Sequence, residues 1–119
     1  MPQADARLRV RKEKGAIFVE FVDRNILDEA NIQQIGEEIT ALIDAEPSPR
    51  LVISFANVDH LSSAALGTLI TIHNRMKAKS GQLRLCNIDP QIYEVFVITK
   101  LNKLFEIHDD TDRAAASFR

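Results

Sequence analysis

The chain has 119 residues, of which 45% are hydrophobic, and its 15 lysines and arginines against 17 aspartates and glutamates give a formal net charge of −2. This length fits one domain with one core, and the charge excludes a general attraction to nucleic acid or to an anionic membrane. No segment reaches the ~20 consecutive apolar residues of a membrane-spanning helix, and the N-terminus lacks the apolar core of a signal peptide. Because Cys86 is the single cysteine, no internal disulfide can form. We therefore expect a cytoplasmic protein.

The first expected element is a β-hairpin. Leu8 and Val10 alternate with arginines, and residues 17–21 repeat the period-2 pattern after a turn at Gly15. Phe18 lies on the opposite face from Ile17 and Val19, which predicts a second strand that is at least partly covered on both sides. The basic stretch 7–14 is interpreted as the polar side of an edge strand, not as a nucleic-acid site.

A polar connection then leads into the first helix. Asp28 is predicted to cap it, and Pro47 and Pro49 end it. Its inward face consists of apolar residues at helical spacing, namely Ile32, Ile35, Ile39, Leu42 and Ile43. Residues 51–55 form an apolar run, which predicts a buried strand.

The next stretch, residues 58–69, is a turn from this strand into a central helix. The helix is predicted to run from about Ser63 to Lys79 and to stop at Ser80-Gly81. Residues 82–88 alternate as a further strand. Strand, helix and strand in this order predict parallel strands joined by a crossover.

The C-terminal part is predicted to contain two more helices and a short strand. Asp89-Pro90 starts a helix that stops near Lys100, with Ile92, Val95, Phe96 and Thr99 as its inward face. An edge strand follows within 103–107, and Asp110 or Thr111 caps a last helix through Phe118. The expected fold class is α/β, a four- or five-stranded mixed sheet with about four helices on one main face.

The sequence contains no pattern of catalytic or metal-binding residues. His60, His73 and His108 lie on different predicted elements without the spacing of metal ligands, and Cys86 is expected to be a buried, inert strand thiol. No glycine-rich phosphate loop occurs. We expect no catalytic residue, no metal, no cofactor and no enzymatic activity.

Two serines stand at the start of the central helix. One of them can cap the helix, which explains one hydroxyl, whereas a phosphate on Ser63 would suit a helix N-terminus and change the charge of the surface. If the loops 22–28 and 58–63 lie at the same end of the sheet, Asp23, Asp28 and Asp59 surround these serines.

Residues 51–70, LVISFANVDHLSSAALGTLI, resemble the signature segment of STAS domains, above all the bacterial anti-sigma factor antagonists, in which D-S-[ST]-G-L-G opens a helix. In this alignment Ser62 falls on the aspartate and Ser63 on the serine that a kinase phosphorylates. Ala64 and Ala65 fall on the next hydroxyl residue and the first glycine, and Leu66-Gly67 on the Leu-Gly pair. Residues 26–39 and 90–107 also resemble family patterns, so the resemblance implies one STAS-like domain over 1–119 with its core at about 8–110.

The resemblance implies partner switching in signal transduction and transcription regulation. The unmodified protein binds a serine kinase that is also an anti-sigma factor, and phosphorylation of Ser63, with Ser62 as the second candidate, ends the binding. The implied partner-binding residues are Asp23, Asp28, Asp59, Ser62, Ser63, Ala64, Ala65 and Gly67. Two departures from the motif bear on this expectation. Ser62 removes a negative charge that helps a kinase to recognise its substrate, and Ala65 adds a methyl group to the contact surface.

Two alternatives stay open. One is a STAS interaction module or scaffold that is not phosphorylated. The other is a small-ligand or nucleotide-binding domain that uses the N-terminus of the Ser63 helix to hold a phosphate. The lack of lysine or arginine near the turn argues against it. The identity of the partner and the oligomeric state do not follow from the residues.

Overall fold

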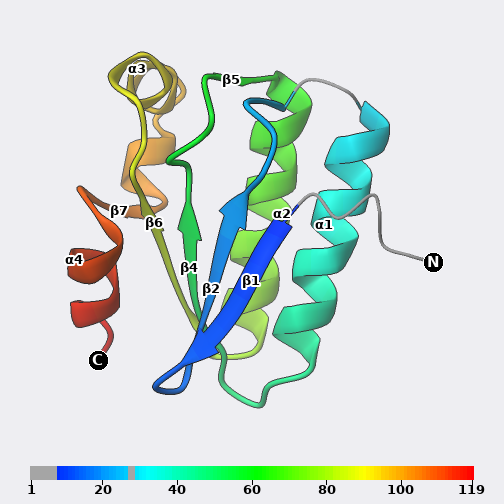
Figure 1. Ribbon diagram of the computed structural model, residues 1–119, viewed down its shortest axis with the longest axis vertical. Helices are drawn as coiled ribbons and strands as arrows, with labels where there is room; N and C mark the ends of the chain where they lie inside the picture. Colours follow the sequence, from blue (N-terminus) through cyan, green and yellow to red (C-terminus); the bar gives the residue numbers. More distant parts are fainter. Residues whose placement is uncertain (1–7, 27–28) are drawn as a thin grey trace.

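The computed structural model describes residues 8–26 and 29–119, and its centre is a five-stranded mixed sheet with the strand order β1-β2-β4-β6-β7 (Figure 1). β1 is antiparallel to β2, and the remaining neighbours are parallel. The strands are β1 (Leu8–Glu13), β2 (Ala16–Phe21), β4 (Arg50–Ser54), β6 (Gln82–Cys86) and β7 (Glu106–His108). This sheet confirms the predicted α/β class.

The β1–β2 hairpin turns at the predicted place. Lys14 and Gly15 both have left-handed backbones, with φ of 51° and 80°, as a two-residue turn between antiparallel strands requires. The register pairs Leu8 with Phe21 and Glu13 with Ala16. Val10 follows the predicted alternation of apolar and polar residues but is 43% exposed, because β1 is at the edge of the sheet.

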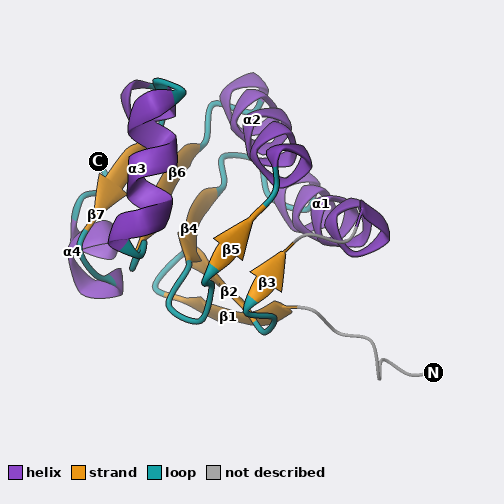
Figure 2. Cartoon of the chain, turned by 90° about the horizontal axis from the view of Figure 1, so that it is seen from above, coloured by secondary structure: helices purple, strands orange, loops and turns teal. Residues whose placement is uncertain are grey.

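The helices follow the expected order. They are α1 (Glu29–Asp44), α2 (Ser63–Ala78), α3 (Pro90–Ile98) and α4 (Thr111–Ala116), with a short 3₁₀ turn, η2 (Leu101–Lys103), after α3. Side chains of α1, α2 and α3 enter the main core cluster, whereas Ala114 of α4 packs with Val52 and Cys86. Figure 2 shows α4 on the other side of the sheet from α1 and α2. The prediction of helices on one main face is therefore right for α1 to α3 and wrong for α4.

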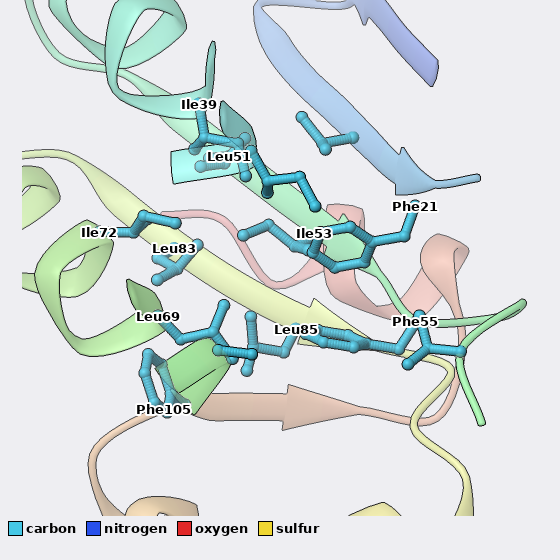
Figure 3. Close-up of a cluster of buried hydrophobic side chains, with 14 of the residues drawn as sticks. Phe21, Ile39, Leu51, Ile53, Phe55, Leu69, Ile72, Leu83, Leu85 and Phe105 are labelled. Carbon is cyan, nitrogen blue, oxygen red and sulfur yellow. The ribbon is translucent and has the colours of Figure 1, made fainter. Parts of the chain in front are cut away.

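The main core lies between the sheet and α1 to α3. Alternate residues of β2, β4 and β6 point into it, and Figure 3 shows Ile53 and Leu85 between the helices and Phe55. Ile39, Leu51 and Leu85 are completely buried. Each such side chain contributes on the order of 2 kcal/mol through removal of its apolar surface from water.

The predicted inward face of α3 is too wide. Ile92 and Phe96, one helical turn apart, are buried, whereas Val95 and Thr99 are exposed. Asp89 caps the helix as predicted, since its Oδ1 accepts a hydrogen bond from the Gln91 backbone N–H at 2.8 Å. α3 thus contacts the core through a single stripe.

Candidate functional site

The candidate site lies where the chain passes from β4 to α2. After β4, the Phe55 N–H donates to the Cys86 carbonyl and the Val58 N–H to the Phe55 carbonyl, both at 3.0 Å. The short strand β5 (His60–Leu61) follows. It pairs in parallel with β3 (Asn25–Ile26), the short strand after β2. This two-stranded sheet places the loop after β2 beside the loop before α2.

Backbone and side-chain contacts tie the two loops together. The N–H groups of Asp59 and His60 both donate to the Arg24 carbonyl, at 2.7 and 3.2 Å. The Arg24 Nε also donates to Asp59 Oδ2 at 3.0 Å, in an exposed ion pair. Asp23 is half-buried in the same loop. The structure therefore brings Asp23 and Asp59 to the end of the sheet where α2 begins, whereas the predicted cap and partner contact Asp28 lies outside the described residues.

The two serines differ in their surroundings. Ser62 has an extended backbone and is the N-cap of α2, since its Oγ accepts a hydrogen bond from the Ala65 N–H at 3.2 Å. Ser63 is the first residue of α2 and is exposed, and its hydroxyl has no hydrogen-bond partner among the residues that the structure describes. The capping role belongs to Ser62, which leaves the Ser63 hydroxyl accessible to solvent.

Small residues surround Ser63 on the exposed side of α2. Ala64 and Gly67 are exposed, and a Cβ atom added to Gly67 would meet no atom within 4 Å. Ala65 is only 5% exposed and belongs to the main core. The prediction that Ala65 adds a methyl group to the contact surface is therefore wrong, because the helix turns this side chain towards the sheet.

The electrostatics of the site include one residue that the sequence reasoning missed. Residues 60–74 contain no lysine or arginine, as noted from the sequence, but the β3–β5 pairing places Arg24 next to Asp59. The end of the sheet is thus not simply acidic. The sequence could have indicated Arg24, because it follows Asp23 in a loop that was already predicted to reach this end of the sheet.

His60 lies in β5 at this site, whereas His73, His108 and Cys86 lie apart from it. His73 is half-buried with its ring 5.6 Å from that of Phe105, and His108 lies 3.3 Å from Glu106. Within residues 8–26 and 29–119, no group of three or more histidine, cysteine, aspartate or glutamate side chains could hold a metal ion. Burial raises the pKa of the Cys86 thiol.

The fold and the serine-bearing turn match the α/β domain that the resemblance implied. A family model of the STAS domain matches residues 8–114, and the chain belongs to this family. Among the helices of the described parts of the chain, none combines the length and the apolar character that a membrane crossing requires.

Known relatives support this assignment. The chain is 28% identical over 96 residues to BtrV of Bordetella bronchiseptica, a candidate anti-sigma factor antagonist, with 81% of this chain and 82% of the relative covered. Its fold is similar to that of an anti-sigma-factor antagonist (STAS) domain protein from Planctomyces limnophilus, with a TM-score of 0.85, 22% identity and coverage of 94% and 97%. The phosphorylated form of the Bacillus cell fate determinant SpoIIAA is also similar, with a TM-score of 0.71, 17% identity and coverage of 92% and 96%.

Proposed function

We propose that this protein is an anti-sigma factor antagonist that binds a serine kinase acting as an anti-sigma factor, and that phosphorylation of Ser63 ends the binding. The observation that carries the proposal is the exposed hydroxyl of Ser63, which bonds no described residue, beside a capping Ser62. A phosphate there would leave the cap in place and add its charge where a partner docks. BtrV and SpoIIAA support the regulatory class, and we expect the protein to act in the cytoplasm.

The proposed contact surface surrounds Ser63. It consists of the exposed side of α2 at Ser63, Ala64 and Gly67, together with the loop that carries Asp23 and Asp59. The small residues allow a partner to approach the helix closely. A phosphoserine adds about −1.5 to −2 charges, and at such a close contact repulsion and the cost of desolvation weaken the complex strongly.

A constitutive STAS interaction module is the second candidate. The observation that favours it is Ser62, a neutral residue at the position where the family motif has an aspartate. This module would use the same surface without a kinase. The two candidates differ only in whether Ser63 becomes modified.

The first experiment is intact-mass analysis of the protein purified from its own cells during growth and under stress, with fragment mapping of the two serines. One phosphate on Ser63 is the result expected for the switch. A wholly unmodified protein in both conditions would favour the constitutive module, and a phosphate on Ser62 alone would contradict the assignment of Ser63.

The second experiment measures binding, by calorimetry, to a serine kinase that co-purifies with this protein. Ser63→Asp is expected to weaken binding at least about tenfold, because it places a negative charge at the contact, whereas Ser63→Ala retains it. Ser48→Asp, at an exposed serine in the loop between α1 and β4, is the matched charge control, because this loop lies at the other end of β4 from Ser63. Equal affinities for wild type and Ser63→Asp would contradict the switch.

A further inference from the structure

The second face of the sheet carries a hollow of about 380 Å³, separate from the Ser63 surface. Strands β1, β2 and β4 form its floor and one wall, and the β6–α3 loop and the start of α4 complete it. α4 packs over β4, β6 and β7, so the half of this face at β1 and β2 stays uncovered (Figure 2). The volume lies within the range of small-molecule sites in proteins.

The floor of the hollow is apolar. Phe18 and Val52 belong to its lining, and Phe18 is only partly buried by the cluster around α4. The guanidinium of Arg11 lies over the Phe18 ring, with its carbon 4.6 Å from the ring centroid. Because Arg11 covers one face of the Phe18 ring, an aromatic ligand contacts the part of Phe18 that stays free, beside Val52.

The inner end of the hollow is polar and already ordered. Asn87, held in a left-handed backbone conformation with φ 58°, donates from Nδ2 to Ser54 Oγ at 2.9 Å and to Thr111 Oγ1 at 3.1 Å. No described residue donates to the Asn87 Oδ1. Ser54 is only 8% exposed, at a strand position where packing under a helix alone would favour an apolar side chain. These groups can hydrogen-bond a polar substituent.

The outer wall carries positive charge. Arg9 and Arg11 line the hollow with one acid, Glu20, so the lining has one excess positive charge. Arg9 lies 3.5 Å from Glu20, and Arg11 pairs with Glu13 outside the hollow. Because exposed ion pairs contribute little, a bound anion can replace a glutamate as the partner of either arginine.

We propose that this hollow binds a small aromatic monoanion. Its ring lies against Phe18 and Val52, its anionic group meets Arg9 and Arg11, and a polar substituent reaches the Ser54–Asn87–Thr111 end. This inference does not depend on the switch at Ser63. The charge balance of the wall favours one negative charge over the several charges of a polyphosphate.

The test uses 2-naphthoate as the probe, in an NMR titration of the ¹⁵N-labelled protein. A rigid probe of this size in an open hollow is expected to bind with a Kd on the order of 1 mM. The expected result is saturable shifts of the amides around Phe18, Val52, Ser54, Asn87 and Thr111. Arg11→Gln is expected to weaken binding about tenfold, because the contact with the carboxylate is lost.

Two controls separate this site from general binding. Lys103→Gln removes the same charge at an exposed position of η2 and is expected to leave the Kd unchanged. The neutral isostere 2-naphthamide is expected to bind more weakly than 2-naphthoate. The proposal is overturned if the shifts map to the exposed side of α3, if the amide binds as well as the acid, if Arg11→Gln has no effect, or if no saturable shift occurs.

Discussion

At the scale of single residues, the two neighbouring serines at the start of α2 have different roles: Ser62 caps the helix, and Ser63 is the proposed site of phosphorylation. The Ser62 Oγ bonds the Ala65 N–H, so it satisfies a helix donor that otherwise has no partner in the helix. Ser63 is exposed and contributes no such bond to another described residue. Two residues of the same type therefore have different effects on stability.

Ser62→Ala is expected to lower the free energy of unfolding by about 1 kcal/mol, because the N-cap is lost. Ser63→Ala, at the adjacent position, is expected to change it by less than about 0.5 kcal/mol, since an exposed side chain without a described partner is removed. Urea denaturation followed by circular dichroism measures both. A larger loss for Ser63→Ala than for Ser62→Ala would contradict the assignment of the cap.

His73 makes stability depend on pH. His73 belongs to α2 and is partly buried beside Phe105. This burial, and to a lesser degree the charge of Lys77, lowers the pKa of His73 from the ordinary value of 6.5. As the pH falls below 6.5, the unfolded chain binds a proton at this histidine while the native protein does not, so stability falls until the pH has passed the lower native pKa. Above 6.5 this contribution to stability is fully present.

His73→Gln is expected to reduce the difference between the urea midpoints measured at about pH 7.5 and about pH 5, because the titrating group is removed. His60→Gln, at an exposed position, serves as the control and should retain the wild-type difference. If the His73 variant is as sensitive to pH as the wild type, other groups cause the dependence.

At the scale of elements, α1 and α2 pack closely and are clamped at one end. A Cβ atom added to Gly36 of α1 would lie 3.0 Å from Thr68 Cγ2 of α2, so this glycine permits the approach of the helices. Near the ends of both helices, Arg75 donates two hydrogen bonds to the Asp44 carboxylate, at 2.9 and 2.7 Å. This paired contact lowers the pKa of Asp44, mainly through hydrogen bonding.

The two helix glycines are expected to respond differently to alanine. Gly67→Ala should raise the free energy of unfolding by about 0.5–1 kcal/mol, because alanine is the better helix former and the site is open. Gly36→Ala has the same gain in helix propensity, but crowding against Thr68 offsets it, so its stability should lie below that of Gly67→Ala. Thermal or urea denaturation measures the order, and the reverse order would contradict the packing.

At the scale of the whole molecule, the sheet has two unequal cores. The main cluster joins β1, β2, β4 and β6 to α1, α2 and α3, whereas the second cluster consists of Val52, Cys86 and Ala114 with Phe18 and Phe118 at its edge. Arg84 lies beside it, buried, and donates from Nε to Ser117 Oγ at 2.7 Å. We infer that α4 can detach while the main core stays folded.

The rate at which the Cys86 thiol reacts can measure this detachment. The thiol is fully buried and burial raises its pKa, so the native protein is expected to react slowly with a thiol reagent such as Ellman's reagent. Ala114→Asp, which places a charge under α4, should accelerate the reaction at least about tenfold, since opening of the helix becomes easier. Ala116→Asp, at an exposed position of the same helix, is the control. A rate in Ala114→Asp equal to that of the control would show that α4 does not protect the thiol.

Most elements could be predicted from the sequence, because their signals are local. The left-handed turn at Gly15, the caps Asp89 and Asp110, and the helical spacing of Ile32, Ile35 and Ile39 all act within a few residues. The family motif likewise pointed to the turn that carries Ser63. Which of the two serines caps α2 could not be predicted from the sequence, since either hydroxyl can accept a hydrogen bond from the first turn of the helix.

What only the tertiary structure decided is which surfaces meet. The position of α4 beneath the sheet, the burial of Ala65 and the contact of Arg24 with Asp59 arise from segments far apart in the chain. The hollow beside Phe18 likewise combines residues of β1, β2 and β4 with Asn87 and Thr111. The amino-acid pattern by itself determined the elements and the serine-bearing turn, because hydrogen bonding and periodicity are local properties. Burial and charge pairing depend on packing between distant segments, which only the folded chain establishes.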